Sequence, residues 1–267
     1  WPDERTLALS IVVNVEEGAE ESIADGDRAP EPVDELQVVM SKGRNFGNES
    51  NYDYGIRAGA HRVLNLLRDY GVTATFTAAA LALERAPDLA KQIVADGHEI
   101  CAHGYRWAHQ HWMKEDMERD FIRKAAESID KTCGKRPAGW LSRYVLTENT
   151  RRLLVEEGYT YHMDDYSDDV PRWDIVDEKP ILISPYALDT NDMKMWMDAS
   201  CTPDQWEKYL IDTFDWLYAE CADSPNKMMS LGVHLRIVGR PGRMKAFENF
   251  LAHAAARDKV WFATRQE

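Results

Sequence analysis

Residues Val72–His103 read VTATFTAAALALERAPDLAKQIVADGHEICAH, and they contain one complete strand–helix–strand unit. The segment Val72–Ala78 is rich in β-branched and apolar residues, which is typical of a buried strand. Segment Pro87–Gly97 has proline at its start and glycine past its end, the usual order for a helix. A third segment, His98–His103, predicts the next strand. Two strands joined by a helix pair in parallel, so this stretch predicts an α/β fold with a parallel sheet.

The same alternation runs along the whole chain. Further strands are expected at Leu7–Val15, Tyr159–Met163, Lys179–Tyr186, Lys227–Leu235 and Val260–Thr264. Further helices are expected at Tyr54–Tyr70, Lys114–Cys133, Thr147–Gly158, Thr202–Cys221 and Met244–Arg257. We therefore predict one domain over residues 1–267, either a β/α barrel or an open parallel sheet. The long acidic stretch from Glu16 to Asn51 shows no such periodicity and predicts a functional loop beside a site.

Charge and composition limit the classes of partner. The chain has 46 acidic and 32 basic residues, with a net charge of -14, so nucleic acid is not an expected partner because phosphate binding needs a basic face. No apolar run approaches the roughly 18 residues that span a bilayer, and no membrane partner is expected. The four cysteines form no C-x-x-C pair and are expected to be buried thiols. With no signal peptide visible, a cytoplasmic location is expected.

Polar residues gather where the predicted strands end. Glu16 and Glu17 follow the first strand, which carries Asn14 near its end, while His103 and His234 end two later strands. In a β/α barrel these strand ends meet at the active face. Two adjacent carboxylates can have different pKa values, so one of them can act as a general base. The alternatives are a solvated acidic loop and histidines that belong to the core.

The stretch CAHGYRWAHQH contains three histidines, His103, His109 and His111. It is typical either of a metal site or of one functional histidine followed by an exposed loop. A lone histidine at a strand end is more often catalytic or structurally satisfied than a metal ligand. We therefore expect His103 to be the functional residue, with His109 and His111 exposed.

Other side chains are candidates for contacts with a substrate. Arg143 could pair with a carboxylate or with a polarised carbonyl group. Asp164 and Asp165 follow the strand Tyr159–Met163, where they are either site residues or an acidic turn. Tryptophans near these places, Trp107 and Trp173 among them, are expected to line a pocket or to pack in the core.

Several of these segments resemble a known family. VVNVEEG, the stretch from VTATF to GHEICAHGYRW, and GVHL occur in the order found in the polysaccharide deacetylase (NodB homology, carbohydrate esterase 4) superfamily. The resemblance covers nearly the whole chain. It implies a single NodB-like domain over residues 1–267, folded as a distorted β/α barrel of about seven strands.

The resemblance also implies roles for individual residues. Members with a metal have an Asp-Asp pair followed by His-x-x-x-His, and here Glu16 matches the catalytic base and Glu17 the metal-binding acid. His103 matches the first metal-binding histidine, but the second falls on Trp107, which cannot bind a metal. His234 matches the general acid. A tetrahedral zinc site would then lack a ligand, so no cofactor is expected; if zinc is bound, Glu17 and His103 would hold it.

A narrower branch shares these departures. NVEEGAE, NESNYDYGIRAG, DDYSDDVPRW, PYALDTNDM and GVHLRIVGRPGR are similar to the metal-independent allantoinase and cyclic imide hydrolase branch. The segments GWLSRYVLTENT and AHQH differ from that branch. The similarity implies catalytic roles for Glu16, Glu17, His103 and His234, and a homo-oligomer, by resemblance a tetramer. The implied substrate-binding residues are Asn14, Glu49, Trp107, Arg143, Asp165 and Trp173.

The function expected from these observations is hydrolysis of a small cyclic amide, either a ureide such as allantoin or an imide, by attack of water on a ring carbonyl. One alternative is a zinc-dependent N-deacetylase that acts on an N-acetylated sugar or peptidoglycan. A second alternative is a NodB-like domain that binds a ligand without turnover.

Overall fold

A single curled sheet forms the centre of the molecule in the computed structural model, which describes residues 1–197, 200–224 and 226–267. Its strands follow the order β6-β7-β5-β4-β3-β2-β1-β8, and β9 pairs with the start of β1 beside β2. Only the β6–β7 pair is antiparallel among the pairings described. The strands are β1 Leu7–Val15, β2 Thr75–Ala78, β3 Glu99–Ala102, β4 Gly139–Trp140, β5 Tyr161–His162, β6 Arg172–Val176, β7 Lys179–Ile183, β8 Lys227–His234 and β9 Val260–Phe262.

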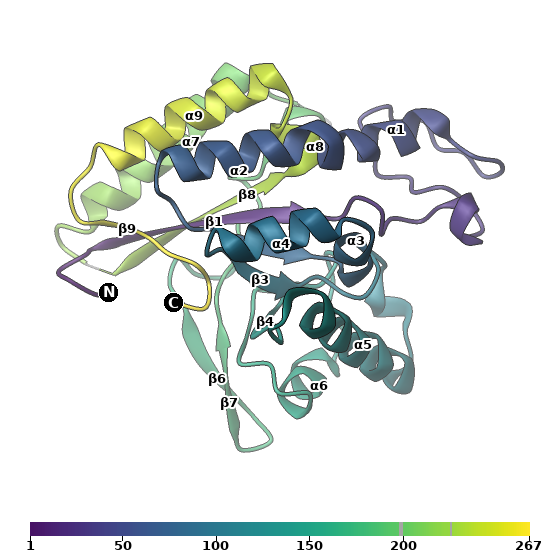
Figure 1. The fold of residues 1–267 in the computed structure, drawn as a ribbon. Helices are drawn as coiled ribbons and strands as arrows, with labels where there is room; N and C mark the ends of the chain where they lie inside the picture. Colours follow the sequence, from purple (N-terminus) through teal and green to yellow (C-terminus); the bar gives the residue numbers. More distant parts are fainter. Residues whose placement is uncertain (198–199, 225) are drawn as a thin grey trace.

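Helices cover the outside of this sheet, and α7 and α9 pack side by side over β8 (Figure 1). On the other side, α4 and α5 pack on β3, and the β6–β7 hairpin projects away from the body of the molecule. The α-helices are α1 Phe46–Tyr54, α2 Ala60–Asp69, α3 Ala80–Arg85, α4 Pro87–Ala95, α5 Glu115–Cys133, α6 Thr150–Glu156, α7 Pro203–Glu220, α8 Leu235–Val238 and α9 Pro241–Ala255. A π-helical turn, η2, spans Gly55–Gly59, and 3-10 turns are η1 Ile23–Asp25, η3 Gln110–Trp112 and η4 Asp192–Met195.

The predicted distorted β/α barrel is confirmed. The sheet curls until Asn191 forms an isolated parallel bridge with Gly232 of β8, which brings the segment after β7 close to the opposite edge. Nine strands are described instead of about seven. The unpredicted strands β4 and β6 gave weak signals because β4 has only two residues and β6 alternates between half-buried and exposed positions.

Alternating side chains of β1 pack into two different clusters, one between the sheet and the helices and one inside the barrel. Leu7, Leu9 and Ile11 belong to the large core between sheet and helices. Val12 packs inside the barrel with a smaller cluster, and Asn14 lies on the same face two residues later because side chains alternate along a strand. Both faces of β1 are buried. This explains why its sequence is a continuous apolar run, and why the polar residues Ser10 and Asn14 stand out within it.

Some predicted boundaries differ from the structure. The helix expected at Tyr54–Tyr70 is preceded by α1, which starts after Asn45, and the side chain of Asn45 accepts a hydrogen bond from the backbone N–H of Asn48. The acidic stretch expected to be irregular as far as Asn51 is therefore shorter. Thr202, the first residue of the range expected for α7, is its N-cap and forms a complete capping box with Gln205.

The cysteine prediction is confirmed in part. Cys101, Cys133, Cys201 and Cys221 are free thiols, but only Cys101 and Cys221 are buried, while the other two are half-buried. In the described ranges of the chain, no helix has both the length and the apolar composition needed to cross a bilayer.

Candidate active site

A cavity of about 730 Å³ opens where the carboxyl ends of the parallel strands meet. Asn14 and Glu16 reach it from the end of β1, His103 from the end of β3, and His234 from the end of β8. The volume lies within the range of small-molecule sites. Loops after other strands complete the wall, with Ser142, Arg143, Tyr144, Tyr166, Tyr186 and Leu188.

The buried carboxylate of Glu16 makes the central polar contacts of this cavity. Its Oε2 accepts a hydrogen bond from Nη1 of Arg236 at 2.7 Å. Its Oε1 lies 3.6 Å from Nε2 of His103 and 3.5 Å from Nε2 of His234, which is longer than an ordinary hydrogen bond. Burial alone would raise the pKa of Glu16, but the positive charges of Arg236 and His234 outweigh it and hold the pKa well below its usual value. Glu16 is therefore ionised at neutral pH.

The next residue, Glu17, is turned away from the cavity. Its Oε1 accepts from the backbone N–H of Arg236 at 3.0 Å, and its Oε2 accepts from the backbone N–H of Glu16 at 3.1 Å. A methyl group at Gly55 would come within 2.4 Å of Oε1, so the carboxylate also packs closely on the π turn. Burial raises the pKa of Glu17, and Arg236 offsets part of that rise. Glu17 joins the ends of β1 and β8 and does not face the cavity.

His234 lies between two carboxylates. Its Nδ1 is 2.7 Å from Oδ1 of Asp192, and its Nε2 faces Glu16. Asp192 is fixed in turn, because its Oδ2 accepts from the backbone N–H groups of His234 and Val238. Burial alone would lower the pKa of His234, but the charges of Glu16 and Asp192 outweigh it and raise the pKa to about 9. His234 is therefore an imidazolium ion at neutral pH.

His103 has a different hydrogen-bonding pattern. Its Nδ1 is 2.7 Å from the carbonyl oxygen of Leu141, and its Nε2 is 3.1 Å from the indole Nε1 of Trp107. A carbonyl oxygen can only accept and an indole N–H can only donate. Nδ1 therefore carries the proton, and Nε2 accepts from Trp107. His103 is thus a neutral imidazole that is held at both nitrogens.

Two buried arginines border Trp107. The guanidinium carbon of Arg143 lies 3.7 Å from the centre of the Trp107 ring, and that of Arg236 lies 5.5 Å from it. Arg143 pairs with both carboxylate oxygens of Glu31, at 2.9 and 2.6 Å, so it pairs with a carboxylate as the sequence suggested. It lines the cavity, but that carboxylate already holds its two terminal nitrogens.

The structure does not bring all the predicted residues together. Glu49 pairs with Arg44 at the surface, and the Asp165 carboxylate is 2.7 Å from Arg172. Trp173 lies on β6 with 67% of its surface exposed. None of these three predicted substrate-binding residues lines the cavity. His109 and His111, expected to be exposed, are half-buried beside Tyr144 and Trp112 and do not line the cavity either.

The side chains do not fit the zinc ion that the metal-dependent members of the superfamily would imply. The Nε2 lone pair of His103, which would bind the metal, accepts the N–H of Trp107. Both oxygens of Glu17 accept backbone N–H groups, and Glu17 does not line the cavity that His103 lines. Within the described residues, no group of three or more histidine, cysteine, aspartate or glutamate side chains could hold a metal ion.

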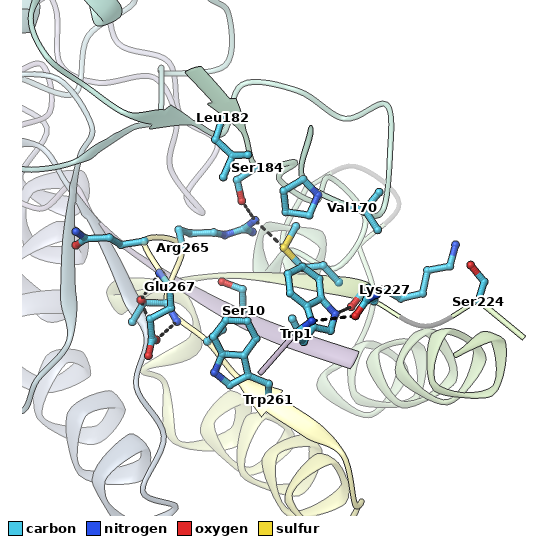
Figure 2. A pocket seen from close by; sticks show the side chains of 17 residues that line it. Trp1, Ser10, Val170, Leu182, Ser184, Ser224, Lys227, Trp261, Arg265 and Glu267 are labelled. Carbon is cyan, nitrogen blue, oxygen red and sulfur yellow. Dashed lines mark hydrogen bonds between the residues drawn. The ribbon is translucent and has the colours of Figure 1, made fainter. Parts of the chain in front are cut away.

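A second cavity, of about 550 Å³, lies where β1 and β8 begin (Figure 2). Its wall includes Trp1, Ser10 and Arg265, and none of the strand-end residues described above. The buried guanidinium of Arg265 lines this cavity and donates to Ser184 and to the carbonyl oxygen of Pro185. This second cavity therefore contains none of the strand-end acid–base groups.

Known proteins match this chain over its whole length. The family described as "Polysaccharide deacetylase" matches residues 49–162. A protein of Schizosaccharomyces pombe (strain 972 / ATCC 24843) named "Putative polysaccharide deacetylase" is 32% identical over 289 residues, which cover 100% of this chain and 90% of the relative. The chain belongs to the polysaccharide deacetylase family. It is therefore a member of a superfamily of hydrolases.

Two solved structures of this family are similar in fold and sequence. One is described as Puue Allantoinase, with a TM-score of 0.95 and 41% identity, and the match covers 100% of this chain and 90% of that one. The other is a probable polysaccharide deacetylase from Pseudomonas aeruginosa PAO1, with a TM-score of 0.95, 42% identity and the same coverage. The similar structures thus carry two different activity names within one family.

Several polar residues of the site were not predicted from the sequence. Arg236, Asp192 and Glu31 are charged and buried, with partners far away along the chain. The sequence held a signal for two of them, because Arg236 lies two residues after His234 and Asp192 lies in PYALDTNDM. Both segments resemble those of the family. Glu31 had no such signal because it lies in the acidic stretch, where many glutamates occur.

Proposed function

We propose that this protein hydrolyses a small cyclic amide, either a ureide such as allantoin or a cyclic imide, at a ring C–N bond. The observation that carries the proposal is the placement of ionised Glu16 3.5 Å from the imidazolium of His234, on the wall of a small-molecule cavity. A carboxylate and a protonated imidazole side by side are a general base and a general acid that are ionised correctly at neutral pH.

Glu16 is the base in this proposal. Arg236 holds Oε2, while among the described residues Oε1 has only long contacts with the two histidines and can take a proton from water. The resulting hydroxide attacks the carbonyl carbon of the ring, and the carbonyl oxygen becomes an oxyanion. Glu17 is not suited to this role because both of its oxygens accept backbone N–H groups.

His234 is the acid. When the ring C–N bond breaks, its Nε2 proton goes to the leaving nitrogen, so the ring opens to a carboxylic acid and an amide or ureide nitrogen. Glu16 is then protonated and His234 is neutral. Because Oε1 and Nε2 are 3.5 Å apart, the proton can return directly and restore both groups. Asp192 keeps the imidazole oriented throughout.

A cyclic amide is favoured by the shape and chemistry of the cavity wall. Aromatic and apolar side chains make up much of the lining, among them Trp107, Leu141, Tyr144, Leu188 and Trp196. Such a wall suits a compact, flat ring. The similarity to a structure described as Puue Allantoinase supports a cyclic ureide as one substrate class.

We propose further that the reaction needs no metal. The indole N–H of Trp107 stands in the position at which a metal would meet Nε2 of His103, and it fixes the tautomer that a metal would otherwise fix. His103 then holds Trp107 against the cavity and does not protonate the substrate, because its one N–H is directed at the carbonyl oxygen of Leu141.

The second candidate function is N-deacetylation of a sugar or peptidoglycan, which the names of the relatives favour. One experiment separates the two. The purified protein is assayed with allantoin, hydantoin, dihydrouracil, succinimide, phthalimide and chito-oligosaccharides, with and without a chelator, and its bound metal is measured. We expect opening of at least one cyclic amide that the chelator does not change. Chelator-sensitive release of acetate from the oligosaccharides, with no ring opening, would favour the deacetylase.

A further inference from the structure

Tyr186, which lines the cavity from the loop after β7, has an unusual pair of hydrogen bonds. Its Oη accepts from the amide nitrogen of Asn14 at 3.0 Å and from the amide nitrogen of Asn191 at 3.2 Å. A phenol oxygen carries one proton of its own. Because both amide N–H groups donate to the oxygen of Tyr186, the hydroxyl proton is directed toward neither of them.

The orientation of both amides is fixed by neighbours that can only donate or only accept. Asn14 Nδ2 also donates to the carbonyl oxygen of Val233 at 3.2 Å, which can only accept. Asn191 Oδ1 accepts from the backbone N–H of Met193 at 3.0 Å, which can only donate. A flip of either amide would break these bonds. Both amides therefore present N–H groups to Tyr186.

The hydroxyl proton of Tyr186 is available to a ligand. Within the described residues, the hydroxyl donates no hydrogen bond to the protein, although its oxygen accepts two. Burial raises the pKa of Tyr186 above its usual value, so the hydroxyl stays protonated at neutral pH. Tyr186 borders this cavity and a second one of about 230 Å³, but Asn14 and Asn191, which contact its hydroxyl oxygen, line only the active-site cavity of the two, so a ligand oxygen reaches the hydroxyl from there.

A glycine makes this arrangement possible. Gly232 lies on β8 opposite Asn191, and a methyl group there would come within 2.3 Å of the Tyr186 hydroxyl oxygen and 2.7 Å of the Asn191 amide nitrogen. Any side chain at this position would displace the hydroxyl. The barrel wall is thus shaped around one hydroxyl group.

We propose that the hydroxyl of Tyr186 donates a hydrogen bond to the carbonyl oxygen under attack and stabilises the negative charge that develops there. Asn14 and Asn191 are positioning residues that aim this proton. The inference rests on the proposed hydrolysis of an amide carbonyl, and it assigns the oxyanion donor that Glu16 and His234 do not supply. A neutral donor held in place before the reaction is suited to this task because it needs no reorganisation.

The test compares Tyr186→Phe with Tyr209→Phe, which removes an exposed hydroxyl on α7 that bonds to Asp189. Substrates are the five cyclic amides and the chito-oligosaccharides named above. For Tyr186→Phe we expect kcat to fall about 10²–10³-fold with KM nearly unchanged, as for loss of one oxyanion donor. The shape of the pH profile should stay the same, because no titrating group is lost. Tyr209→Phe should match the wild type, and thermal unfolding checks that both variants fold.

Gly232→Ala provides an independent variant. We expect it to lower kcat in the wild-type background and to have a smaller effect in the Tyr186→Phe background, where no hydroxyl remains to be displaced. Purely structural damage would give the same loss in both backgrounds and would contradict the inference.

The outcomes separate the two proposals. If the wild type opens a cyclic amide and Tyr186→Phe keeps its kcat, or changes only KM, this inference is overturned and the proposed function stands. If the wild type deacetylates oligosaccharides and opens no ring, the proposed function fails. The kcat of Tyr186→Phe for release of acetate from the oligosaccharides, compared with that of the wild type, then decides the role of Tyr186. If the wild type hydrolyses neither class, both are overturned.

Discussion

Glu16 and Glu17 are neighbours in the chain, yet their pKa values move in opposite directions. Both are fully buried, which by itself raises the pKa of a carboxyl group. Glu16 faces Arg236 and His234, and their positive charges outweigh burial, whereas Glu17 keeps a raised pKa beside the negative charge of Glu16. The residue type is the same, so the difference comes entirely from the direction in which each side chain points.

The two glutamates should respond differently to the same substitution. For Glu16→Gln we expect kcat to fall by about 10²–10⁴-fold, the usual contribution of a general base. Glu17→Gln should have a much smaller effect on kcat but should lower stability by about 1–3 kcal/mol, because its amide N–H₂ would meet a backbone donor. Steady-state kinetics and denaturant unfolding measure the two effects. A larger loss of kcat in Glu17→Gln would reverse the assignment.

The raised pKa of His234 predicts how stability and activity depend on pH. Its pKa rises from the ordinary 6.5 to about 9 in the folded protein, so its contribution to stability is fully present below about pH 6.5 and is lost as the pH rises through about 9. The difference in unfolding free energy between wild type and His234→Gln should shrink over that interval. The kcat/KM of the wild type should fall above about pH 9, because the acid loses its proton. An activity that is flat to pH 10 would contradict the assigned acid.

At the scale of elements, the junction of β8 and α8 supplies two of the charged groups of the site. His234 ends β8, and Arg236 lies in α8, which turns away at once. The π turn η2 packs directly on α8 because Gly59 and Gly239 meet without side chains. Such π turns inside helices often mark functional sites, and here the turn also supports Glu17 through Gly55.

The close contact between η2 and α8 can be tested by a pair of substitutions. A methyl group at Gly59 would lie 2.0 Å from the carbonyl oxygen of Leu235, so Gly59→Ala should destabilise the protein by about 1–3 kcal/mol through overpacking. Gly242, in α9, has no atom of the described residues within 4 Å of an added methyl group, so Gly242→Ala should be neutral or stabilising by about 0.5–1 kcal/mol. Equal unfolding midpoints for the two variants would show that the contact is looser than described.

At the scale of the whole molecule, the acidic stretch between β1 and α1 is tied to distant parts of the barrel. The Glu31–Arg143 pair links it to the loop after β4, and both side chains are almost fully buried, with 0% and 1% exposed. Asn48 donates to the backbone of Glu31, and Tyr52 donates to that of Val33. Val33 and Asp34 of this stretch line the cavity, so the stretch lies beside the candidate site, and its functional role stays a prediction.

Breaking this buried pair should destabilise the molecule much more than breaking an exposed one. Glu31→Gln leaves the buried Arg143 without its counter-charge, so we expect a loss of about 3–5 kcal/mol in unfolding free energy. Arg44→Ala removes a pair in the same region whose side chains are 47% and 25% exposed, and it should lose less than about 1 kcal/mol. Denaturant unfolding measures both, and similar losses would show that the pair does not anchor the loop.

The sequence by itself determined the fold class and the edge of the sheet at which the chemistry lies. Strand and helix periodicities are local properties, and parallel strands bring Asn14, Glu16, His103 and His234 to one edge whatever the details of packing. Short or exposed strands such as β4 and β6 were not predicted because their sequences show little alternation of apolar and polar residues. Glu49 was predicted from the resemblance, and Asp165 and Trp173 also from their places near the strand ends, but the structure places all three outside the cavity.

Only the tertiary structure decided which groups share protons. The choice between Glu16 and Glu17, the tautomer of His103 and the free proton of Tyr186 all depend on contacts between distant residues, such as Arg236 with Glu16 across 220 positions of the chain. Charge and hydrogen-bond direction act over a few ångströms in space, and separation along the sequence carries no information about them. The sequence therefore named the strand-end residues of the site, whereas their buried partners and their protonation states came only from the fold.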